Sequence, residues 1–162
     1  MGNYEKYFEG KTDIEISGDF LNACKNLNLD KIDFIIKSKK EKINSFAINE
    51  GLLDIARSVD NDKQTRKLNC VEVILDNIDI NIIDNYINKI QQSIAFDNDN
   101  LGKYFLSKFH TLLSDEEKIN IYIGTIEIKN IGMLMFFNEC CVESHIEQDR
   151  KSTRLNSSHG YI

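Results

Sequence analysis

Residues 28–37 read NLDKIDFIIK, a short polar stretch followed by apolar residues at helical spacing. The pattern returns as LNCVEVILD at residues 68–76, DNLGKYFLS at 99–107 and EIKNIGMLMF at 127–136. The last three copies are separated by about 30 residues, and the first gap is longer. Recurrence at such a period is typical of a stacked repeat array rather than of a single globular core. Arrays of this kind usually serve as binding scaffolds.

Each copy is the second half of a predicted helix pair. In the first pair, Leu29 and Ile36 lie on one stripe of the second helix. In the second pair, the extra residues 62–68 are interpreted as an insertion in the turn between the helices, which explains the longer gap. Ser114 and Glu117 have the spacing of a capping box at the start of the fourth pair. The predicted fold class is all-α, an α-solenoid of about four stacked helix-turn-helix repeats.

The predicted repeat array spans residues 18–148. Its repeats cover approximately residues 18–45, 46–81, 82–113 and 114–142. Residues 1–17 precede the array and are expected to form an irregular capping segment. One helix pair cannot bury both sides of its apolar stripe, so each pair is expected to pack against its neighbours. A buried Ile or Leu contributes roughly 1.5–3 kcal/mol, so a polar substitution at Ile36 or Leu75 is expected to damage a whole repeat.

The end of the chain differs from the rest in composition. Residues 149–162, DRKSTRLNSSHGYI, resemble the translation of a sequencing-adapter oligonucleotide, which predicts a tail that is not native protein. The alternative is a natural basic tail that contacts nucleic acid. Before this tail, residues 128–142 are predicted to form the last helix. Residues 133–137 within it are apolar almost all round, whereas a terminal repeat typically has a polar outer face. We therefore expect that more native chain covered this helix, the alternative being a small self-contained end.

Charge and hydropathy exclude several classes of partner. The net charge of −6 becomes −8 without the predicted tail, because three basic residues and one acidic residue are removed. An acidic chain lacks the basic face that nucleic acid requires. No apolar run reaches the ~18–20 residues of a membrane span, and the N-terminus has no signal-peptide core. Four cysteines without disulfide spacing indicate reduced thiols. A cytoplasmic location is expected, or the host cytosol after secretion without a signal peptide.

The first pair resembles an ankyrin repeat. Residues 21–26, LNACKN, resemble the end of the family's first helix, with Ala23 at the small-residue position, and residues 28–36 resemble its second helix. Residues 42–44, KIN, and 79–81, DIN, resemble the close of the connecting loop, which projects as a finger in that family. The resemblance covers about residues 18–142 and makes the chain a degenerate ankyrin-like array. A different helical-hairpin solenoid is the competing interpretation.

The chain also departs from the ankyrin pattern. The Thr-Pro-Leu-His opening is absent, since the chain contains no proline. Lys40 and Asn77 stand where a glycine normally ends the second helix. Glycine or asparagine supplies the positive-φ residue at helix ends and turns. The finger loops are therefore expected to lack regular β-hairpins.

No arrangement of residues indicates catalysis. Cys140, Cys141 and His145 could supply soft metal ligands, but no second ligand pair stands at a finger-like spacing, so structural cysteines are favoured. Residues 97–100, DNDN, lack the glycine and glutamate of a calcium loop and are interpreted as a turn. His110 has no partner at a catalytic spacing. The sequence therefore predicts a protein that is not an enzyme, with no metal and no cofactor.

The ankyrin resemblance implies recognition of another protein through the finger loops and the exposed side of each first helix. By position, the candidate residues are Lys42, Asn44, Asp79 and Asn81 in the loops and Asn22, Lys25, Asp54 and Arg57 on the helices. The predicted function is a protein–protein interaction scaffold within a longer protein. The alternative is a repeat segment appended to an enzyme or regulatory protein whose functional domain is missing from this chain.

Overall fold

The computed structural model describes residues 3–142 of the chain. All regular elements in this range are helices, which confirms the all-α class. The tail predicted at residues 149–162, and His145 with it, lie outside the described residues.

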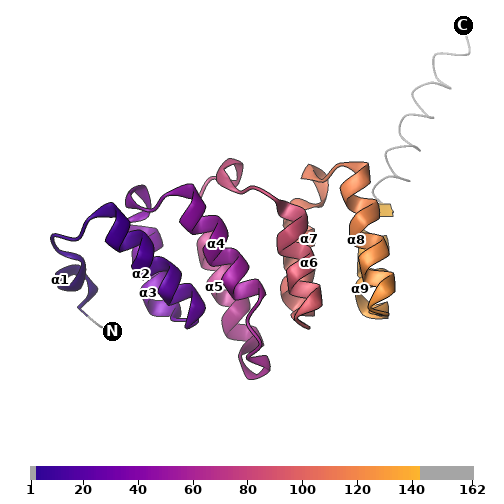
Figure 1. Cartoon of the computed structure of the whole chain (residues 1–162), viewed down its shortest axis with the longest axis horizontal. Coiled ribbons are helices and arrows are strands. Elements are labelled where there is room, and N and C mark those ends of the chain that lie inside the picture. The colour runs from indigo at the N-terminus through magenta and orange to yellow at the C-terminus, as the bar shows by residue number, and fades with distance from the viewer. Residues whose placement is uncertain (1–2, 143–162) are drawn as a thin grey trace, which may run out of the picture.

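Four helical hairpins follow one another in a row (Figure 1). Their helix pairs are α2 (Asp13–Lys25) with α3 (Leu29–Ser38), α4 (Ser45–Ala56) with α5 (Gln64–Asn77), α6 (Tyr86–Ala95) with α7 (Asp99–Phe109), and α8 (Asp115–Glu127) with α9 (Ile131–Phe137). The first helices α2, α4, α6 and α8 contact one another in that order. The second helices α3, α5, α7 and α9 do the same in a second layer. Each hairpin therefore buries its apolar stripe against its neighbours in the row.

Three hairpins share one turn geometry. Its left-handed residue is Leu27 (φ 52°), Asp97 (φ 58°) or Lys129 (φ 57°). The backbone N–H of the following asparagine donates to the backbone carbonyl oxygen five residues earlier: Asn28 to Ala23 (2.9 Å), Asn98 to Ser93 (2.8 Å) and Asn130 to Thr125 (3.2 Å). This is the Schellman pattern that ends a helix. Because the turns match, positions in the fourth hairpin follow those in the third by 32 residues, as Lys129 follows Asp97.

The second hairpin has a different turn. After α4 ends, the chain forms a 3-10 turn (η2, Asn61–Lys63) and α5 begins at Gln64. The predicted insertion at residues 62–68 is therefore mostly helical, because residues 64–68 extend the N-terminus of α5. Lys67 lies in this extension, and its ammonium group is completely buried.

A buried asparagine joins the second and third hairpins. Asn98 Nδ2 donates to the carbonyl oxygens of Ala56 (2.7 Å) and Ser58 (3.0 Å). Asn98 Oδ1 accepts from Lys67 Nζ (2.8 Å) and from Gln64 Nε2 (3.2 Å). Lys67 Nζ also donates to the Ser58 carbonyl (2.9 Å). Burial lowers the pKa of Lys67, an effect that Asp60 partly opposes.

Short 3-10 turns occupy the loops between hairpins: η1 (Lys40–Lys42), η3 (Ile80–Ile82) and η4 (His110–Leu112). The sequence predicts that these loops lack regular β-hairpins, and the structure has 3-10 turns at these positions instead. Asn49 of α4 holds the second loop, because its Nδ2 donates to the Ile82 carbonyl (3.0 Å) and its Oδ1 accepts from the Asp84 amide (3.0 Å). This second loop is therefore tied to the first-helix layer.

The N-terminal segment corrects one expectation. Residues 1–17 were expected to be irregular, but the described part contains α1 (Tyr4–Phe8) and the start of α2, whose N-cap is a Thr12–Glu15 capping box. Phe8 is buried, and its ring stacks on that of Phe34 with centroids 5.7 Å apart. This ring packing, rather than local helix propensity, fixes a helix of only five residues. Helix α1 therefore covers α3 at the N-terminal end of the row.

The fourth hairpin confirms one detail and changes another. The predicted capping box between Ser114 and Glu117 is present. The last helix, expected to run from residue 128 to 142, is shorter: α9 covers Ile131–Phe137 and a π-helical turn (η5) covers Asn138–Val142. Residues 128–130 form the tight turn instead, because Lys129 takes the left-handed conformation.

Candidate functional site

The eight residues predicted to bind a partner lie at two ends of the first-helix layer. Lys42, Asn44, Asp79 and Asn81 are exposed in the loops that precede α4 and α6, whereas Asn22, Lys25, Asp54 and Arg57 stand at the C-terminal ends of α2 and α4. Helix α4 has 12 residues and is therefore about 18 Å long. The structure thus separates the predicted residues into two groups instead of bringing them into one cluster.

Two members of the loop group have structural roles. Asn44 is the N-cap of α4, and its Oδ1 accepts from the Ala47 amide (2.7 Å). Asp79 Oδ1 accepts from the Asn81 amide (2.9 Å) and so shapes its own turn. The side chains of Lys42 and Asn81 are exposed. The loop group therefore combines turn-forming residues with exposed polar ones.

The helix group belongs to a larger repeating surface, here called the first-helix face. It consists of Ile14, Gly18, Asn22 and Lys25 on α2 and of Phe46, Glu50, Asp54 and Arg57 on α4, all exposed or half-buried. Each set has the spacing i, i+4, i+8 and i+11, which places its members on one side of a helix. Each α4 residue follows its α2 counterpart by 32 residues. The face is therefore the same surface presented twice.

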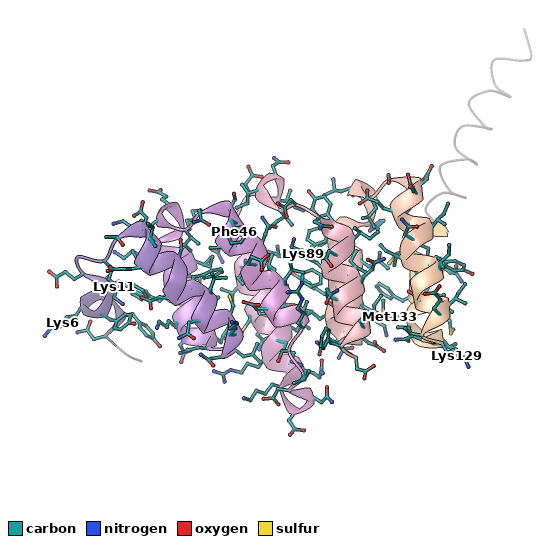
Figure 2. The ribbon with its side chains drawn as sticks, viewed as in Figure 1. Lys6, Lys11, Phe46, Lys89, Lys129 and Met133 are labelled. Carbon is teal, nitrogen blue, oxygen red and sulfur yellow. The ribbon has the colours of Figure 1, made fainter. Side chains whose placement is uncertain are left out.

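The face changes character from the loop end to the turn end. At the loop end, Ile14 is 84% exposed and Phe46 is 68% exposed; Figure 2 shows Phe46 near the start of α4. At the turn end, Arg57 Nε donates to Gln92 Oε1 on α6 (3.2 Å). A partner would therefore meet apolar side chains at one end and a cationic side chain at the other.

Asp54 interacts electrostatically with both cations of the turn end, Lys25 and Arg57. Burial raises the pKa of its carboxyl group, and Glu50 raises it further. Lys25 and Arg57 oppose this effect, since an opposite charge favours the ionised form. A second carboxylate arriving from a partner would share the same two cations. The turn end therefore holds two cations and two carboxylates, with Lys25 and Arg57 as its exposed cationic side chains.

Sequence reasoning missed Ile14 and Phe46 as surface residues, because large apolar side chains are usually buried. A signal was present in the sequence. Each is the second residue after an N-cap, Thr12 for Ile14 and Asn44 for Phe46. The shared position in two repeats could have identified them as a pair on one surface.

The described part of the chain offers little for metal or acid–base chemistry. Residues 3–142 hold no group of three or more His, Cys, Asp or Glu side chains arranged for a metal ion. Burial raises the pKa of Cys140, and that of Cys141 to about 11, so these thiols stay protonated at neutral pH. Within the same range, no helix has the length and apolar character that a membrane span requires.

No family model, no curated protein and no solved structure matches the chain. The resemblance to ankyrin repeats therefore stays an interpretation of the residues, supported by the repeated packing of helical hairpins.

Proposed function

We propose that the chain is a protein-binding scaffold built from ankyrin-like repeats, and that a partner protein contacts the first-helix face. The repeated hairpins support this, because they present corresponding residues of α2 and α4 side by side. The observation that carries the proposal is the pairing of exposed Ile14 and Phe46 with polar and charged residues along the same helices. Apolar anchors within a polar surround are the usual composition of a protein interface.

The face defines the chemistry of the partner segment. Eleven residues separate Phe46 from Arg57, which corresponds to about 16 Å along a helix. A matching segment carries an apolar side chain for Phe46 and Ile14, and an acidic group for Lys25 and Arg57 at that distance. The acidic group pairs with the cations of Lys25 and Arg57, and the apolar side chain removes exposed ring surface from water.

The proposal is tested by selecting peptides from a displayed random library against the full chain. Recovered peptides are then titrated against Phe46→Ala and against the control Val59→Ala, whose side chain is equally accessible but lies in the turn between α4 and α5. An interface anchor is worth about 2 kcal/mol or more, so Phe46→Ala should weaken binding about 30-fold. The control should bind as the parent chain does.

A second variant tests the charged end of the face. Arg57→Gln should weaken peptides that carry an acidic group and leave those without one unchanged. Peptides that lose affinity equally with Val59→Ala and Phe46→Ala would contradict the proposal. So would a set of binders without apolar or acidic residues in common. Cys24 and Cys70, which are buried as thiols in the described part of the chain, support the further proposal of a reducing compartment such as the cytosol.

A further inference from the structure

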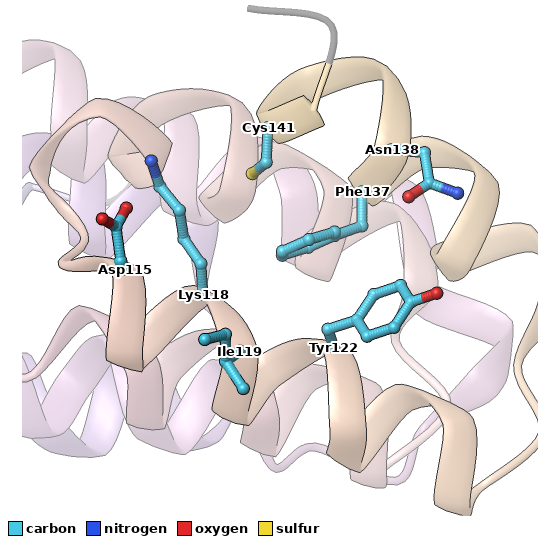
Figure 3. Close-up of a pocket in the computed structure, with 7 residues that line it drawn as sticks. All are labelled: Asp115, Lys118, Ile119, Tyr122, Phe137, Asn138 and Cys141. Carbon is cyan, nitrogen blue, oxygen red and sulfur yellow. The ribbon is translucent and has the colours of Figure 1, made fainter. Parts of the chain in front are cut away.

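A hollow of about 470 Å³ opens between α8 and α9 at the end of the row. Ile119 and Tyr122 of α8 form one wall, and Phe137 of α9 and Cys141 form the other (Figure 3). The rings of Tyr122 and Phe137 lie with their centroids 5.6 Å apart. The floor of the hollow is therefore apolar and comes from both helices of the fourth hairpin.

The residues that line the hollow correspond to residues of the third hairpin that lie 32 positions earlier in the chain. Ile119, Tyr122, Phe137 and Cys141 follow Ile87, Ile90, Phe105 and Phe109 of the third hairpin by 32 residues. Ile90, Phe105 and Phe109 are completely buried, and Ile87 is half-buried. The third hairpin has α8 packed on α6 and α9 packed on α7, whereas in the described range only the π-helical turn η5, and no further hairpin, follows α9. The hollow thus corresponds to a buried position of the preceding hairpin.

The exposed apolar surface around the hollow shows the same difference. Ile94 of α6 is 4% exposed, but Ile126, its counterpart on α8, is 47% exposed. Ile123, Ile131 and Met135 are also exposed, although their counterparts in the third hairpin are the polar residues Gln91, Asp99 and Lys103. Exposed apolar side chains that gather on one hairpin are typical of an interaction site. We call this surface the end face, made of Ile119, Tyr122, Ile123, Ile126, Ile131 and Met135.

We propose that the end face binds a further helical hairpin of the same construction, which continues the row. The packing of α8 and α9 on the third hairpin is the model for this contact, and the end face extends that interface in the same direction. The inference rests on the packing of the described hairpins and is independent of the first-helix face.

A second copy of this chain does not supply such a hairpin by head-to-tail stacking. In head-to-tail stacking, the end face of one copy would meet the first hairpin of the next copy on the side away from the second hairpin. Helix α1 already packs on that first hairpin, with the ring of Phe8 on that of Phe34. The occupant is therefore a hairpin in which the side that packs on the preceding hairpin is not covered by another element.

The rim of the hollow sets the chemistry of the occupant. Asp115, Lys118 and Asn138 stand at the rim, where the third hairpin has Ile83, Tyr86 and Leu106. The occupant thus carries an apolar stripe for Ile119 and Tyr122, bordered by polar side chains where it meets the polar rim.

The test places a known hairpin against the end face. A second copy of residues 111–142 is inserted between Val142 and residue 143 of the full chain, which keeps the 32-residue spacing. The control insert carries Ile121→Lys and Met133→Lys within the added copy only. These are the residues that face the preceding hairpin in the natural fourth hairpin, where Ile121 lines the α6–α8 crevice and Met133 lies near Gly102.

Stacking should slow amide hydrogen exchange in α8 at least about tenfold relative to the control, because local opening must then break the new contact. Equal α8 exchange rates in the two inserted chains would overturn the proposal. Sedimentation of the unmodified chain tests self-association. A dimer at micromolar concentration that Ile119→Asp dissociates would assign the end face to a second copy and also overturn it. Peptide binding at Phe46 is a separate measurement, so either proposal can fail alone.

Discussion

Asn98 is predicted to be the most sensitive polar residue of the row. The three turn asparagines Asn28, Asn98 and Asn130 share one backbone geometry, but their side chains make different hydrogen bonds. Asn28 Oδ1 only caps its own helix, accepting from the Lys31 amide (3.2 Å). Asn98 makes no such cap and instead connects two carbonyls of the second hairpin with the buried ammonium of Lys67.

The structure gives the magnitude of each change. Asn98→Ala removes a hydrogen bond to a buried charge, worth about 1.5–3 kcal/mol, and leaves the Ala56 carbonyl without its side-chain donor, at a cost of about 1–3 kcal/mol. The expected loss of unfolding free energy is about 3–5 kcal/mol. Asn28→Ala removes one capping bond and should cost about 1 kcal/mol. The ratio between the two variants separates the connection between hairpins from simple capping.

Urea unfolding followed by circular dichroism measures both variants. A double-mutant cycle with Lys67→Met then isolates the Asn98–Lys67 bond, for which a coupling energy of about 1 kcal/mol or more is expected. Equal losses for Asn98→Ala and Asn28→Ala would refute the reasoning. Strict additivity in the cycle would show that the buried lysine does not depend on Asn98.

Two further predictions concern packing and pH. A Cβ at Gly51 would lie 2.8 Å from a ring carbon of Phe20 and 2.9 Å from Cys24 Sγ, so Gly51→Ala should lower the melting temperature through overpacking. At Gly18 a Cβ meets nothing within 4 Å, so Gly18→Ala should raise stability by about 0.5–1 kcal/mol. A higher melting temperature for Gly51→Ala than for Gly18→Ala would contradict this packing. Burial raises the pKa of the Cys70 thiol from 9.0 to about 11, so its contribution to stability is complete below the unfolded pKa and is lost as the pH rises toward the folded one. The loss of unfolding free energy should reach about 1 kcal/mol near pH 10. Between about pH 8 and pH 10, the unfolding free energy of Cys70→Ala should therefore decline less than that of the parent chain. Equal declines in the two proteins would show that another group titrates.

Local signals explain which parts of the fold were predictable. The second helices were predictable because Leu29, Ile32 and Ile36 repeat at helical spacing within one turn or two of each other. The capping box of Ser114 and Glu117 is equally local. Helix α1 was not predictable, since it depends on contact between Phe8 and Phe34, which are distant in sequence. Polar substitution should also be worse at Ile36 than at Leu75, because only Ile36 is completely buried.

The candidate site shows the same division. Sequence position identified Asn22, Lys25, Asp54 and Arg57 as exposed ends of first helices, and these residues do share a surface. Sequence position did not identify Phe46, which is exposed because no element among residues 3–142 packs over its side chain at the loop end of α4.

Apolar spacing and N-caps act over only a few residues, and they are therefore enough to predict short paired helices and the apolar stripe that each helix buries. The burial of polar side chains, in contrast, follows from the packing of one hairpin on the next. Lys67 and Lys89 are completely enclosed although lysine is normally exposed. Lys67 is held by Asn98, 31 residues away, and Lys89 Nζ donates to the Asp84 carbonyl (2.5 Å). Burial depends on the neighbouring hairpin, and that neighbour lies beyond the range of any local pattern.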